Sequence, residues 1–152
     1  MLYTALKFLH VVAAIVWVGG AIAMTVLNIR LARARNREAL AVLSNLSPFY
    51  GQAVLGPAAG LTLLAGIATA LNAGFPFRSL WIIWGFAAIL LSVALGATLI
   101  RVTMQRLSAY ATASDGEPAQ IAALQGRLAL WNAINILLLL SAVWVMVAKP
   151  TL

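Results

Sequence analysis

The sequence predicts an all-α integral membrane protein, a four-helix bundle with both termini outside and two connections on the cytoplasmic side. Three observations support this prediction: the composition, four long apolar runs and an uneven distribution of positive charge. Of the 152 residues, 64% are hydrophobic and 9% are charged. A soluble domain has about 25% charged residues and less than half apolar ones, so this composition cannot cover a water-soluble surface.

The four apolar runs predict four membrane spans within a single domain that covers residues 1–152. They lie at about 2–29, 51–71, 80–100 and 128–147. About 20 helical residues cross the hydrocarbon core, and each run is long enough. Backbone polar groups cannot stay unpaired in lipid, so we expect each span to be a helix.

The distribution of basic residues predicts the orientation. The connections between spans 1 and 2 and between spans 3 and 4 carry Arg30, Arg33, Arg35, Arg37, Arg101, Arg106 and Arg127. The opposite side carries Lys7, Arg78 and Lys149. The positive-inside rule places the arginine-rich side in the cytoplasm of a multi-pass protein of the bacterial inner membrane. The net charge of +7 then has a sufficient explanation in orientation and in contact with the lipid bilayer, and we expect no nucleic-acid partner.

The connection between spans 1 and 2 contains a short apolar stretch at residues 39–46. It predicts an interfacial helix that lies on the cytoplasmic leaflet. Ser47 and Pro48 then predict the start of the second helix, with serine as the N-cap and proline at the first helical position. In the other long connection, we expect the third helix to continue through residues 102–110 and a new helix to begin near Ala119.

Small residues recur at helical spacing in the spans. Gly56 and Gly60 lie four residues apart in the second span, with Pro57 between them. A further stripe in the third span consists of Ala88, Ser92 and Gly96. Such stripes allow helices to approach closely in lipid, which predicts packing within the bundle; the alternative is a homodimer or a larger membrane complex. Pro57 removes a backbone hydrogen bond and predicts a kink.

The acidic residues and the absent cysteines limit the chemistry that is available. Glu38, Asp115 and Glu117 all lie in the arginine-rich connections, and the chain has no cysteine. This excludes intramembrane carboxylate relays, paired-carboxylate hydrolysis and thiolate chemistry. No catalytic residue is assigned, and the sequence favours a role other than an enzyme.

Five residues predict a ligand pocket at the outer mouth of the bundle. Trp17 follows His10 by seven residues, on the same helical face and about 10 Å deeper. His10 would contact a metal or a polar head group, and Trp17 would pack against an apolar body. Lys7 or Arg78 would neutralise an anionic group, and Trp84 lies on the same side. The alternative is an aromatic belt with contacts to lipid phosphates.

Two amides give a second candidate site. Asn132 and Asn135 are three residues apart in the fourth span and therefore share a helical face. They predict either hydrogen bonds between helices or a site for a polar ligand or water.

The segment from Lys7-Phe8-Leu9-His10 to Trp17-Val18-Gly19-Gly20 resembles the first helix of several small bacterial membrane families. One is a four-helix integral membrane family of unknown function, and that likeness covers nearly the whole chain, including Gly56-Pro57 and the closing residues 144–150. Helix 1 also resembles the copper-resistance D proteins and the HemJ-type protoporphyrinogen oxidases. The first of these two resemblances implies copper transfer, and the second implies haem b with His10 as its ligand.

The first functional hypothesis is a binding or accessory protein that holds a lipophilic cofactor or a partner subunit at helix 1. The second is a haem-dependent membrane oxidoreductase that acts on porphyrin or quinone. The third is a small homo-oligomeric transporter, which rests on Pro57 and the glycines of the second span.

Overall fold

The computed structural model describes residues 1–34, 36–113 and 117–149. These residues form helices and connections and include no strand. Four helical segments are long and apolar enough to cross a membrane: Leu2–Ala34, Glu38–Ala73, Leu80–Thr112 and Pro118–Ala148. The prediction of an all-α membrane protein with four spans is confirmed.

Two of the four long helices contain a π-helical turn. The first helix, α1, spans Leu2–Ala34. The second consists of α2 (Arg37–Tyr50), the π-helical turn η1 (Gly51–Leu55) and α3 (Gly56–Ala73). The third consists of α4 (Leu80–Leu95), the π-helical turn η2 (Gly96–Ile100) and α5 (Arg101–Thr112), and the fourth is α6 (Pro118–Ala148).

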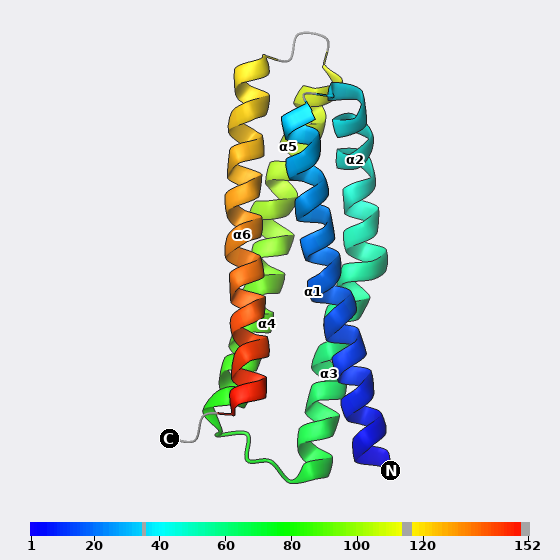
Figure 1. Cartoon of the computed structure of the whole chain (residues 1–152), viewed down its shortest axis with the longest axis vertical. Helices are drawn as coiled ribbons and strands as arrows, with labels where there is room; N and C mark the ends of the chain where they lie inside the picture. The colour runs from blue at the N-terminus through cyan, green and yellow to red at the C-terminus, as the bar shows by residue number, and fades with distance from the viewer. Residues whose placement is uncertain (35, 114–116, 150–152) are drawn as a thin grey trace.

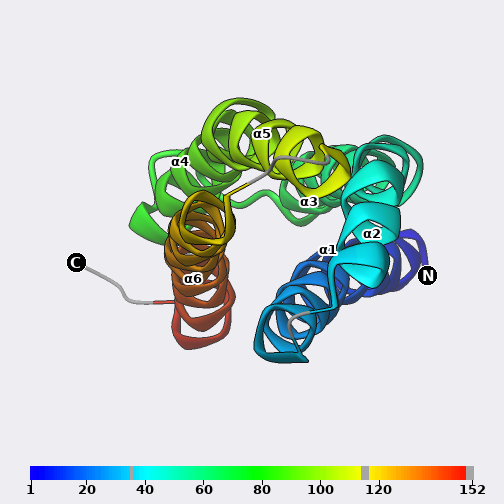
Figure 2. The same cartoon turned by 90° about the horizontal axis from the view of Figure 1, so that it is seen from above.

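The long helices run along one axis, with the start of α1 and the end of α6 at the same end of the bundle (Figure 1). We call this end, which also holds the 74–79 connection, the terminal end, and the opposite end the arginine end. Figure 2 shows the helices from above, with α1 next to α6. α1 contacts α3 and α6, α4 contacts α6, and α2 contacts α5. The start of α1 and the end of α6 lie at the same end, as an even number of spans requires.

The bundle is longer than a bilayer is thick. A helix of 33 residues such as α1 extends about 50 Å, against a hydrocarbon core of about 30 Å. At the arginine end, α2, α5 and α6 meet in a core of buried apolar side chains: Leu40, Met104, Leu107, Ile121 and Leu128. The continuation of the third helix past residue 102 and the restart of the chain as a helix at Pro118 are confirmed.

The expected interfacial helix at 39–46 is wrong. This stretch belongs to α2, which packs lengthwise against α5 and buries Leu40 and Leu43 there. The helix begins at Arg37, because the Asn36 side chain caps it by accepting a hydrogen bond of 2.9 Å from the Ala39 N–H. Ser47-Pro48 is therefore not a helix start, and Pro48 lies inside α2.

The expected packing of Gly56 and Gly60 within the bundle is also wrong, while the alternative, a homodimer contact, stays a prediction. Both residues are exposed, and a Cβ atom on Gly60 would meet nothing within 4 Å. The π-helical turn η1 precedes Pro57, and the Gly56 N–H bonds to the Gly51 carbonyl five residues back. In the third span, Ala88 and Ser92 do pack, since they are 0% and 3% exposed. The third member of that stripe, Gly96, does not, because a Cβ atom there would meet nothing within 4 Å.

Other glycines make the close helix contacts. A Cβ atom on Gly66 of α3 would lie 3.0 Å from two atoms of the His10 ring, and one on Gly20 of α1 would lie 2.7 Å from the Tyr50 hydroxyl. The chain thus brings α1 against the second long helix at positions that the glycine spacing did not indicate.

Candidate binding groove

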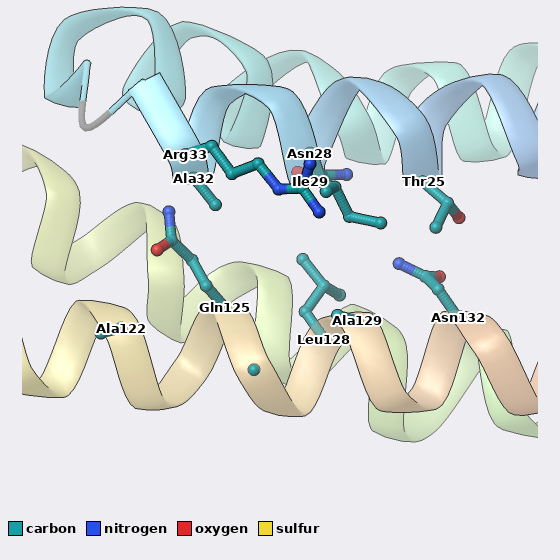
Figure 3. A pocket seen from close by; sticks show the side chains of 11 residues that line it. Thr25, Asn28, Ile29, Ala32, Arg33, Ala122, Gln125, Leu128, Ala129 and Asn132 are labelled. Atoms are coloured by element: carbon teal, nitrogen blue, oxygen red, sulfur yellow. The ribbon is translucent and has the colours of Figure 1, made fainter.

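A cavity of about 320 Å³ lies between α1 and α6 in the half of the bundle nearer the arginine end (Figure 3). Small-molecule pockets in proteins have volumes of about 300–1,000 Å³, so this groove lies at the lower end of that range. Its lining residues are Thr25, Asn28, Ile29, Ala32 and Arg33 from α1, and Ala122, Gln125, Gly126, Leu128, Ala129 and Asn132 from α6.

Small residues on the facing sides of the two helices explain the space. Ala32 on α1 and Ala122, Gly126 and Ala129 on α6 all line the groove. Such short side chains cannot fill the distance between two helix axes, so a gap remains between α1 and α6. Ile29 and Leu128 provide its apolar surface.

Polar side chains enter the groove from both helices. Figure 3 shows Gln125 and Asn132 of α6 pointing toward α1. The Arg33 side chain extends along α1 toward Asn28. The groove therefore combines a guanidinium and several hydrogen-bonding groups with an apolar wall.

Asn28 has an unsatisfied acceptor. Its Nδ2 donates a hydrogen bond of 2.9 Å to the Met24 carbonyl, and the side chain is buried. Its Oδ1 is buried and has no hydrogen-bond partner among the residues that the structure describes. A buried acceptor without a donor costs about 1–3 kcal/mol, so Asn28 lowers the stability of this part of the fold.

Thr25 presents a second acceptor on the same wall. Its hydroxyl donates to the Ala21 carbonyl at 2.8 Å, which uses its hydrogen and leaves lone pairs. The α1 wall thus offers an acceptor at Thr25 and donors at Arg33.

The predicted amide pair divides between two roles. Asn135 is buried, and its Oδ1 accepts a hydrogen bond of 2.6 Å from the Ser92 hydroxyl of α4. This confirms the interpretation of Asn135 as a link between helices. Asn132 instead lines the groove between α1 and α6.

The structure places His10 against α3. Its Nδ1 donates a hydrogen bond of 2.7 Å to the Thr62 carbonyl, and its ring packs on Gly66. Trp17 is 7% exposed and belongs to a buried cluster with Ala58, Ala59 and Leu139, which joins α1, α3 and α6.

The other residues of the predicted outer pocket are exposed or bonded to other partners. The Trp84 indole N–H donates to the Ser141 hydroxyl of α6 at 3.1 Å, while Lys7 and Arg78 are exposed. Among the described residues, no hydrogen bond joins His10 to Lys7, Arg78 or Trp84. Their convergence around one ligand stays a prediction.

His10 does not belong to a cluster of metal-binding side chains within the described residues. The described part of the chain contains no group of three or more His, Cys, Asp or Glu side chains that could hold a metal ion.

The sequence reasoning did not identify the groove. Thr25, Asn28, Arg33 and Gln125 are not among the site residues that the sequence predicts. A signal was available: Gln125 and Asn132 are seven residues apart on one face of α6, and both lie near the same membrane boundary as Thr25 and Asn28 of α1. Which face of α1 meets α6 could not be read from one sequence.

Comparison with known proteins gives one match. A family model described as "Predicted integral membrane protein (DUF2269)" matches residues 4–150. No curated protein and no solved structure matches the chain.

Proposed function

We propose that this chain, which belongs to the DUF2269 family of predicted integral membrane proteins, is a binding protein that holds an anionic membrane amphiphile between α1 and α6. The groove supports this proposal, because it joins a guanidinium at Arg33 to the side-chain amides of Gln125 and Asn132 and to an apolar wall. An amphiphile has the same combination of a polar head and an apolar body.

The charge of the groove favours an anionic head group. Its lining residues include Arg33 and no acidic side chain. Under the predicted orientation, the groove faces the cytoplasmic leaflet, whose anionic lipids are attracted to basic segments near the membrane surface.

The lining residues are suited to binding more than to reaction. Amide, hydroxyl and guanidinium groups fill the polar part of the groove, and its lining residues include no carboxylate, imidazole or thiol. The groove therefore offers recognition without a general acid or base, which is consistent with an accessory role.

The test fills the groove with a larger side chain. Ala129 lines the groove, whereas Ala133, one turn further along α6, is exposed and does not. We expect the purified Ala129→Leu variant to lose the binding of an anionic amphiphile, such as oleoyl lysophosphatidic acid, that native mass spectrometry detects with the unmodified chain. The Ala133→Leu variant should keep it. Equal retention in both variants, at equal thermal stability without lipid, would contradict the proposal.

A second candidate function, haem binding in an oxidoreductase, has one observation in its favour. Metal-bound histidines usually donate their other ring N–H to a carbonyl or carboxylate, and His10 Nδ1 donates to the Thr62 carbonyl. Nε2 then carries the lone pair that an iron would need. We expect a Soret band after haem-replete expression that disappears in His10→Gln, and colourless, stable protein would contradict this candidate.

A further inference from the structure

We infer that the outer face of the second long helix binds a second copy of this chain, so that two copies form a parallel homodimer around a pair of Gln52 side chains. The groove between α1 and α6 is lined by no residue of the second long helix. Dimer formation on this face is therefore independent of the proposed ligand binding.

Gln52 lies at the depth of the hydrocarbon core. It belongs to the π-helical turn η1. Gly20 of α1 lies beside this turn, since a Cβ atom on Gly20 would be 2.7 Å from the Tyr50 hydroxyl and 2.8 Å from Leu55. Arg30 follows Gly20 by ten residues, which is about 15 Å along α1. The hydrocarbon core is about 30 Å thick, so the Gln52 amide is near its middle when Arg30 marks its boundary.

This amide has no partner within the described part of the chain. Gln52 is exposed, and none of the hydrogen bonds among the described residues involves its side chain. By contrast, the Thr62 hydroxyl of the same long helix donates to the Ala58 carbonyl, and Ser92 donates to Asn135. The core of a bilayer holds no water that could bond to an exposed amide. Polar side chains at this depth almost always face other protein groups, so the exposed amide points to a partner from another molecule.

The surface around Gln52 allows another helix to approach closely. Gly56 and Gly60 follow Gln52 at intervals of four residues, and both are exposed. A π-helical turn takes more residues than an α-helical turn, so η1 brings Gln52 close to the line of Gly56 along the helix axis. A Cβ atom on Gly60 would meet nothing within 4 Å in the chain. In lipid, small residues let two helices come close enough for side-chain hydrogen bonds between them.

A second copy of the chain matches this face. A glutamine amide has both donors and an acceptor, so two such side chains can exchange two hydrogen bonds. Membrane insertion gives both copies the same orientation and depth, and a twofold axis along the membrane normal brings identical residues together. Gln52 then meets the partner's Gln52, and the glycines of one copy meet those of the other. Two neutral amides at one depth satisfy each other without a buried charge.

The main experiment measures dimer dissociation in lipid. The purified chain carries one fluorophore at Phe77→Cys, an exposed position outside this face. It is reconstituted in liposomes over a series of protein-to-lipid ratios, and single-molecule photobleaching counts the subunits in each particle. We expect dimers that dissociate on dilution. Gln52→Leu should weaken the dimer about tenfold, the effect of two lost hydrogen bonds between helices. Gln52→Asn keeps an amide and should recover part of the loss.

Gly60→Leu tests the close approach separately from the fold. Its side chain should weaken the dimer as well, because it would hold the two helices apart. The fold of each copy should stay intact, since no atom of the same chain lies within 4 Å of the Gly60 Cβ position. Helical circular dichroism checks this in both the Gln52→Leu and the Gly60→Leu variant.

Cross-linking locates the contact, because the chain has no cysteine of its own. Gly60→Cys should form a disulfide-linked dimer in liposomes under copper phenanthroline oxidation. Leu140→Cys is the matched control and should stay monomeric. Ala59 and Leu139 pack in one buried cluster, so Gly60 and Leu140, the next residues of each helix, lie at similar depth. Leu140 is 44% exposed on α6, away from the second long helix.

Three results would overturn the inference. Monomers at every protein-to-lipid ratio would exclude a second copy as the partner and would leave a different membrane protein to meet Gln52. Dimers whose dissociation is unchanged in both Gln52→Leu and Gly60→Leu would form through another face. Equal cross-linking of Gly60→Cys and Leu140→Cys would show collision without a specific contact.

Discussion

The hydrogen bond between Ser92 and Asn135 connects α4 to α6 inside the bundle. The two side chains are 3% and 8% exposed, and their oxygen atoms are 2.6 Å apart. Replacement of Ser92 by alanine removes the donor and little volume. Hydrogen bonds between membrane helices contribute about 0.6 kcal/mol on average and at most about 1.7 kcal/mol. Because this pair is short and buried, we expect Ser92→Ala to lower the free energy of unfolding by about 1–1.7 kcal/mol.

A double-mutant cycle isolates the energy of this pair. Ser92→Ala, Asn135→Ala and the double variant are unfolded reversibly by sodium dodecyl sulfate in mixed micelles, and loss of helical circular dichroism gives each free energy. A coupling energy of about 0.6–1.7 kcal/mol is expected, which corresponds to a change of about 3- to 20-fold in the unfolding equilibrium. Additive single effects, with a coupling energy near zero, would refute the assignment of Asn135 as a link between helices.

Asn132 is the matched control in this series. It lies one turn away on the same helix, has the same side chain and lines the groove. Asn132→Ala should change stability by less than about 0.5 kcal/mol, since it leaves the Ser92–Asn135 bond intact. A loss as large as that of Asn135→Ala would show that the two amides share one structural role.

Two further predictions concern helix packing and orientation. Gly66→Ala should destabilise the fold despite the higher helix propensity of alanine, because the new Cβ atom would displace the His10 ring. Gly60→Ala should be neutral or stabilising, since its Cβ atom would meet nothing. The same unfolding assay compares the two variants, and greater stability of Gly66→Ala than of the unmodified protein would contradict the contact. Since the chain has no cysteine, single cysteines at the exposed positions Glu117 and Phe77 can report orientation. An impermeant maleimide applied to intact cells should label Phe77→Cys and not Glu117→Cys, and the reverse result would invert the predicted orientation.

The sequence predicted the four spans well because the bilayer sets the length of an apolar helix. It predicted the helix ends less well. The spans were expected near 2–29, 51–71, 80–100 and 128–147, whereas the helices extend further toward the arginine end. Amphipathic segments such as α2 can lie on a membrane or continue a bundle, and the buried contact of Leu40 with its partners in α5 and α6 decides for the bundle.

The glycine positions show why packing could not be read from spacing. Gly56 and Gly60 have the spacing of a close helix contact but are exposed. Gly66 and Gly20 make close contacts because of single partners, His10 and Tyr50, on other helices. Whether a glycine lies in a helix contact depends on how each helix is rotated about its axis, and interactions between distant residues set that rotation.

Unequal packing along α1 also explains why a groove forms beyond Thr25. The half of α1 nearer the terminal end is held closely by other helices: His10 bonds to α3, Trp17 is buried among side chains of α3 and α6, and Gly20 lies against Tyr50. Beyond Thr25, the face of α1 toward α6 carries polar residues, and small residues of α6 lie opposite. Close packing at one end of α1 thus fixes the helix while the other end leaves space. A ligand that binds the folded state there stabilises it, by about 2.7 kcal/mol when the free ligand concentration is 100 times the dissociation constant. Because the groove lies outside the closely packed half of α1, it can be occupied without any rearrangement of that half.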